Sequence, residues 1–158
     1  MRSVALGMVL LLGCQSSAPE VKKDAVAEAP RLLVAMERGP CFGACPVYRV
    51  EVFTDGLVRF EGKRFVKATE LVEGKLSAAQ VKAISDRLAA VDFKWADYTH
   101  ADATDNPTVV LTHETRTLKH YQGDHSAPET LTKLEDDLDA LIGTAKWVKG
   151  DMAGAADR

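Results

Sequence analysis

Apolar and polar residues alternate with a period of two along the first half of the chain, and this alternation predicts β-strands. A first strand is expected over 32–37, where both faces are partly apolar. Two further strands are expected over 47–53 and 57–65, and a fourth within 66–75. Glycine, proline and aspartate separate these stretches, and such residues favour turns.

The loop at 54–56 decides how the second and third strands pair. A three-residue loop with Gly56 in the left-handed conformation pairs Val50 with Phe60 on one face. The same register pairs Glu51 with Arg59 on the other face, whereas a two-residue loop places Glu51 opposite Phe60. Each matched pair contributes a few tenths to about 1 kcal/mol. The sequence therefore predicts the three-residue loop, with one apolar and one charged face.

The period changes to that of a helix at two places, each preceded by a capping box. These boxes are Ser77 to Gln80 and Ser126 to Glu129. The apolar stripes that follow consist of Val81, Ile84, Leu88 and Val91 in the first helix and of Leu131, Leu134, Leu138, Leu141 and Ile142 in the second. A second hairpin is expected between the helices, over 108–113 and 116–121.

The order of these elements predicts an α+β fold of the type ββββ-α-ββ-α. The economical packing is one antiparallel sheet of β-hairpins with two α-helices on one face. Gly143 is expected to end the second helix, and Trp147 and Val148 to dock behind it. We expect a single α+β domain over 31–149 and a disordered tail over 150–158.

Composition adds the class of protein. A chain of 158 residues, 46% hydrophobic and 27% charged, has the composition of an ordinary globular protein. It is long enough to bury a hydrophobic core without disulfides or metal ions. Its net charge of −3 supplies no basic field, so no nucleic-acid partner is expected.

The N-terminus has the pattern of an export signal. A positive start at Arg2 precedes nine residues without charge, 4–12, which are too few to span a bilayer. The following Leu11-Leu12-Gly13-Cys14 is similar to the lipobox of bacterial lipoproteins, in which the cysteine is acylated, with palmitate a typical chain. We expect a signal peptide over 1–13, and a lipidated Cys14 with a flexible tether over 14–30. The alternatives are an ordinary secretory peptide with a chance cysteine, or a short buried helix.

The expected location follows from this signal. The membrane is a partner through the lipid at Cys14, and the domain lies in the bacterial cell envelope. Gln15 follows the cysteine where an aspartate would retain the protein at the inner membrane. The outer membrane, on its periplasmic face, is therefore expected if the organism has two membranes.

Cys41 and Cys45 remain as a pair, and an exported compartment favours a disulfide between them. Four residues of extended chain span about 13 Å, whereas a disulfide requires Cα atoms about 4.4–6.8 Å apart. The segment must therefore turn back on itself, and Gly43 lowers the cost of this turn.

The stretch 39–48, Gly-Pro-Cys-Phe-Gly-Ala-Cys-Pro-Val-Tyr, is the most distinctive in the chain. Together with Phe60-Glu61-Gly62 and Asp105-Asn106-Pro107-Thr108, it resembles a family of uncharacterised bacterial exported proteins, domain of unknown function 6438. The resemblance covers about residues 31–148. It implies an exported, often lipid-anchored domain and brings no known activity or ligand.

The same cysteine pair also matches the CxxxCP motif of copper chaperones, since two thiolates suit Cu(I). That motif lies between a strand and a helix, whereas the residues after Pro46 alternate as a strand does. His113 and His120 flank one hairpin, but their spacing does not predict a metal site. The acidic run 135–139 is interpreted as a solvated helix face. Trp95 and Tyr98, in the acidic connection 92–107, are candidates for a recognition surface, or else close the edge of the core.

These observations predict a non-catalytic envelope lipoprotein that binds a protein or an envelope polymer and carries no cofactor. No hydrolase, zinc-protease or nucleotide-binding motif is found, so there is no warrant for an enzyme. The alternative is a periplasmic copper-binding or thiol-redox protein that uses Cys41 and Cys45.

Overall fold

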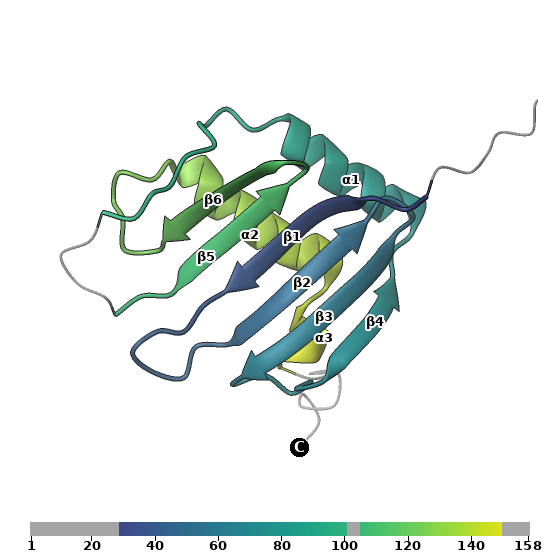
Figure 1. Cartoon of the computed structure of the whole chain (residues 1–158), viewed down its shortest axis with the longest axis horizontal. Helices are drawn as coiled ribbons and strands as arrows, with labels where there is room; N and C mark the ends of the chain where they lie inside the picture. The colour runs from purple at the N-terminus through teal and green to yellow at the C-terminus, as the bar shows by residue number, and fades with distance from the viewer. Residues whose placement is uncertain (1–28, 101–104, 150–158) are drawn as a thin grey trace, which may run out of the picture.

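A computed structural model describes residues 29–100 and 105–149. Six strands form one antiparallel sheet in the order β4-β3-β2-β1-β5-β6 (Figure 1). The strands are β1 (Leu32–Arg38), β2 (Val47–Phe53), β3 (Leu57–Arg64), β4 (Leu71–Lys75), β5 (Thr108–His113) and β6 (Arg116–Tyr121). The helices are α1 (Ala78–Ala89), α2 (Glu129–Ile142) and the short α3 (Ala145–Val148). The predicted α+β fold is confirmed, with α3 as an additional turn of helix.

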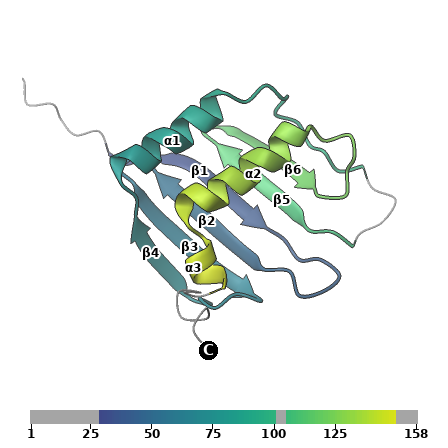
Figure 2. The ribbon, with the colours of Figure 1, turned by 180° about the vertical axis from the view of Figure 1, so that it is seen from behind.

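The helices lie on one face of the sheet, so the core forms between them (Figure 2). Phe60 of β3 is fully buried at its centre and stacks on Tyr48 and on Trp147, with both ring centroids 5.1 Å away. Other fully buried residues come from every layer: Val34, Met36, Val50, Ile84, Leu111, Leu118, Leu131 and Leu138. In the part of the chain that the structure describes, no helix has the length and apolarity needed to cross a membrane.

The register of the β2–β3 hairpin is the predicted one. Val50 lies opposite Phe60, and Glu51 lies opposite Arg59. Gly56 has a φ of 86°, and a Cβ atom there would approach the carbonyl oxygen of Leu76 to 2.7 Å. The turn therefore requires glycine both for its conformation and for space.

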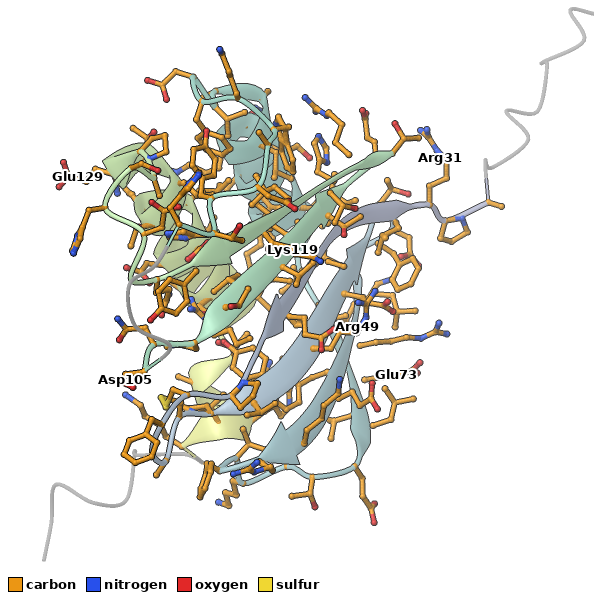
Figure 3. The ribbon with its side chains drawn as sticks, turned by 60° about the vertical axis from the view of Figure 1, so that its left-hand side comes forward. Arg31, Arg49, Glu73, Asp105, Lys119 and Glu129 are labelled. Carbon is orange, nitrogen blue, oxygen red and sulfur yellow. A yellow bond between two sulfur atoms is a disulfide. The ribbon has the colours of Figure 1, made fainter. Side chains whose placement is uncertain are left out.

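The other face of the sheet is open and charged. Figure 3 shows Arg49 and Lys119 on this side of the strands. Arg49 contacts Glu51 at 2.8 Å and Glu37 at 3.6 Å. Exposed ion pairs of this kind contribute little stability, so the hydrophobic face is what fixes the fold.

Two details of the prediction need correction. The fourth strand fills only 71–75 of the predicted range 66–75, and the chain bends over 65–70 before it. The second capping box is wrong: the N-cap of α2 is Pro128, without a side-chain cap. Ser126 instead donates both its hydroxyl, at 2.6 Å, and its amide, at 2.8 Å, to Asp124 Oδ1, and this charge-assisted pair holds Ser126 in the turn before the helix.

Candidate functional site

The loop of residues 39–46 joins β1 to β2 and is closed by a disulfide between Cys41 and Cys45, as the sequence predicted. The two Cα atoms are 5.8 Å apart. Gly43 sits between the cysteines with a φ of 152°, in the region that favours glycine. The amide of Gly43 donates to the carbonyl oxygen of Cys41 at 3.0 Å, which tightens the turn.

Backbone hydrogen bonds fasten this cysteine loop to the segment before β5. Gly39 donates its amide to the carbonyl oxygen of Thr108 at 2.8 Å, and Phe42 donates to that of Asp105 at 3.0 Å. A Cβ atom on Gly39 would lie 3.0 Å from the Thr108 oxygen, so the two segments are in close contact. The loop is therefore a fixed wall at the end of the sheet, on the side where Figure 3 labels Asp105.

A polar cluster lies directly behind the loop. Arg38 ends β1 and is paired across the strands with Tyr48 of β2. Both side chains meet Asp139 of α2: the Tyr48 hydroxyl donates to Oδ1 at 2.7 Å, and Arg38 Nε donates to Oδ2 at 2.9 Å. Arg38 Nη2 is 2.7 Å from the same Oδ2, and Thr144 donates its hydroxyl to Oδ1 at 2.6 Å. Asp139 thus joins the sheet to the helical layer.

The charges in this cluster stabilise one another. Burial by itself lowers the pKa of Arg38, but the charge and hydrogen bond of Asp139, together with Tyr48 and Glu135, outweigh it, and the pKa of Arg38 is raised. Burial also raises the pKa of the Tyr48 phenol, and the nearby Asp139 carboxylate raises it further because it repels a phenolate. At neutral pH the raised pKa values keep the Arg38 guanidinium charged and the Tyr48 phenol neutral.

Tyr48 provides a test in alkaline solution. Its folded pKa lies above the unfolded value of about 10, so the neutral phenol contributes stability below pH 10. That contribution is lost as the pH rises through 10 towards the folded pKa. We expect absorbance at 295 nm to show no phenolate from Tyr48 while the fold persists, and Tyr48→Phe to remove one late-titrating group. If Tyr48→Phe instead removed a phenol that titrates near pH 10, the raised pKa of Tyr48 would be contradicted.

A groove of about 530 Å³ opens between the cysteine loop and the α2–α3 corner, above this cluster. Its walls are mainly apolar and come from Cys45, Pro46, Pro107, Ala140, Ala145 and Val148. Its polar groups are Arg38, Tyr48, Gln122, Asp136, Asp139, Thr144 and Lys149. Cys45, Pro46 and Tyr48 of the distinctive stretch 39–48 therefore form part of the wall and floor of this groove.

A second buried polar pair lies beside the cluster. Glu135 is fully buried, and its Oε1 is 2.7 Å from His120 Nδ1. Gln122 donates to the other carboxylate oxygen at 3.3 Å. The interpretation of 135–139 as a solvated face is therefore wrong for Glu135 and Asp139. Both carboxylates lie on the side of α2 that faces the sheet, and both are bound by side chains of the strands.

The histidines do not come together. His113 Nδ1 is 2.7 Å from the carbonyl oxygen of Leu33 in β1, whereas the partner of His120 is Glu135 of α2. Across the hairpin, His113 lies opposite Arg116 and His120 lies opposite Val109. No group of three metal-binding side chains occurs among the residues that the structure describes.

Trp95 and Tyr98 lie away from the groove and pack on the edge of the core. The Trp95 ring contacts Phe93, His113 and the Arg116 guanidinium, the last at 4.7 Å from the ring centroid. Tyr98 forms a parallel bridge to His120 and covers the free edge of β6. The buried indole N–H of Trp95 has no hydrogen-bond partner among the residues that the structure describes. Both aromatic residues thus pack against the edge of the core.

The chain after the cysteine loop is a strand. Pro46 leads directly into β2, which is paired with β1 and β3. The helix that follows CxxxCP in the copper chaperones is absent at this point of the described chain.

Sequence reasoning missed Arg38, Glu135 and Asp139. A signal was available for two of them, because Glu135 and Asp139 are four residues apart and adjoin Leu131, Leu138 and Ile142 on the helix. Carboxylates beside an apolar stripe require buried partners, and the strands supply them: Arg38 and Tyr48 for Asp139, and His120 for Glu135.

Comparison with known families agrees with this description. The family model described as a domain of unknown function (DUF6438) matches residues 32–142. The chain therefore belongs to this family, and the matched segment runs from β1 to the end of α2. No curated protein matches the chain.

Proposed function

We propose that the protein is a lipid-anchored component of the bacterial cell envelope whose domain binds a partner and carries out no catalysis. The lipobox-like sequence that ends at Cys14 supports the anchor. The groove beside the cysteine loop supports the binding role, and it is the observation on which that role rests.

The polar floor of the groove favours binding over catalysis. The Asp139 carboxylate accepts hydrogen bonds or ion-pair contacts from Arg38, Tyr48 and Thr144. The Tyr48 hydroxyl donates to Asp139 and accepts from Arg38 Nε at 3.0 Å. These groups hold one another in place, so neither Asp139 nor Tyr48 is free to exchange a proton with a substrate.

The occupant that fits the groove is a short extended segment of another envelope protein. Proline, alanine and valine walls suit apolar side chains, and the lining carries two cations, Arg38 and Lys149, and two anions, Asp136 and Asp139. A balanced set of charges suits a polypeptide, which presents donors and acceptors together, better than it suits a polyanion. An envelope polymer without peptide is the competing occupant.

The test is to fill the groove. Ala140 is an exposed residue of α2 at the wall, so Ala140→Trp should obstruct the groove and leave the core intact. Ala79→Trp, at an exposed position of α1, is the matched control. The full-length lipidated protein is used to capture partners from solubilised envelopes. We expect Ala140→Trp to lower the recovery of a defined protein at least 10-fold, and Ala79→Trp to leave it unchanged.

Equal recovery by the two variants, with equal unfolding midpoints, would overturn the groove as the binding site. Recovery of glycan without protein that is lost only in Ala140→Trp would replace the polypeptide by the competing polymer. Both variants are compared with the wild-type protein in the same extract.

A further inference from the structure

A second surface lies where the β3–β4 turn meets α3, at one end of the sheet (Figure 2). The backbone amide of Lys67 donates to the carbonyl oxygens of Trp147 and Val148, both at 3.1 Å. The amide of Ala68 donates to Trp147 at 2.9 Å. Two segments far apart in the sequence thus form one rigid corner.

Phe65 projects from this corner. Its side chain is 51% exposed, and its φ of 54° is uncommon for a residue other than glycine. The turn behind it is compact, because a Cβ atom on Gly62 would overlap the carbonyl oxygen of Ala68. The guanidinium of Arg64 lies 5.1 Å from the centroid of the Phe65 ring. The turn therefore presents an aromatic ring and a cation to solvent at some conformational cost.

The charge of the corner is opposite to that of the whole chain. Residues 64–70 and 145–149 contain Arg64, Lys67, Lys146 and Lys149 but only one acid, Glu70, although the net charge of the protein is −3. No salt bridge joins any of these four cations to another residue of the described ranges. We call Arg64, Phe65, Lys67, Lys146 and Lys149 the basic corner.

We propose that the basic corner docks on the surface of an anionic lipid bilayer. Lysine and arginine side chains without a salt-bridge partner attract anionic head groups, and an aromatic ring is stable at the interface between head groups and acyl chains. This inference rests on the proposed anchor at Cys14, which would keep the domain close to such a surface.

The tether is long enough for this orientation. Residues 15–30 span at most about 55 Å when fully extended, whereas β3 is about 26 Å long. The corner can therefore reach the bilayer even though β1 begins at the opposite end of the sheet (Figure 1). Lys149 belongs to both the corner and the groove, so docking would place the groove beside the membrane.

The experiment uses the processed chain from position 14 with Cys14→Ser, so that no lipid is attached. Flotation is measured with phosphatidylcholine vesicles that contain 40% phosphatidylglycerol or none. Lys67→Gln with Lys149→Gln removes two charges of the corner. Lys94→Gln with Lys119→Gln removes two exposed charges elsewhere and is the matched control. Phe65→Asn removes the ring and keeps a residue that tolerates the left-handed backbone.

We expect the protein to bind the vesicles that contain phosphatidylglycerol and not the neutral ones. Lys67→Gln with Lys149→Gln should weaken this binding about 30-fold, since each charge contributes about 1 kcal/mol. The control pair should change binding less than 3-fold, and Phe65→Asn should weaken it several-fold. Equal losses in the two pairs, equal binding to neutral vesicles, or no binding would each overturn the inference. Binding of an acidic protein at the corner, without any binding to vesicles, would also overturn the inference. None of these outcomes depends on whether Cys14 is acylated in cells.

Discussion

Asp139→Ala is expected to lower the free energy of unfolding by about 3 kcal/mol. The substitution removes the partner of the largely buried Arg38 guanidinium, and breaking such a pair from one side leaves an uncompensated charge. It also removes the acceptor of the Tyr48 and Thr144 hydroxyls. Urea denaturation at neutral pH, followed by tryptophan fluorescence, measures the change.

Asp136→Ala is the matched control on the same helix. Asp136 is 3.7 Å from Arg38 Nη2 but 73% exposed, so its removal should cost less than about 1 kcal/mol. If the two variants were equally stable, the cluster would not join α2 to the sheet. Tyr48 should also titrate at lower pH in Asp139→Ala than in the wild type, because the carboxylate that repels its phenolate is gone.

The second large effect concerns location. Replacing Cys14 by serine should move nearly all of the protein from the membrane fraction to the soluble fraction, because the acyl chains supply most of the membrane affinity. The basic corner alone is too weak to compensate. A retained leader would hold the chain at the membrane, so residues 1–13 are exchanged for a secretory leader with an ordinary cleavage site in the variant. Fractionation and intact mass measure the outcome.

The control for this experiment is the pair Cys41→Ser with Cys45→Ser, behind the native leader. It removes the disulfide and leaves Cys14, so the protein should stay in the membrane fraction. A serine variant that remained membrane-bound at high salt, or a wild-type protein without added acyl mass, would count against the lipid anchor.

The hairpins were predictable because local rules and long-range packing agree there. The pairing of Val50 with Phe60 satisfies side-chain matching, and the turn at Gly56 satisfies backbone geometry. The disulfide of Cys41 and Cys45 was predictable for a similar reason, since their spacing and the expected exported compartment point to the same bond.

The polar floor of the groove was not predicted, because its members come from distant parts of the chain. Arg38 and Asp139 are 101 residues apart, and only the packing of α2 on the sheet brings them into contact. Charge alone made the acidic run appear solvated, whereas two of its carboxylates are paired inside the fold. At the start of α2, the nearby Asp124 bound the hydroxyl that the capping rule assigned to the helix.

The groove beside the cysteine loop can be examined most directly by photo-crosslinking in intact cells. A benzophenone amino acid is placed at Ala140, on the wall of the groove, and in a parallel strain at Ala79 on α1. We predict one protein adduct of reproducible mass from position 140 and none from position 79. The same adducts from both positions, or no adduct from position 140, would contradict a binding site in the groove.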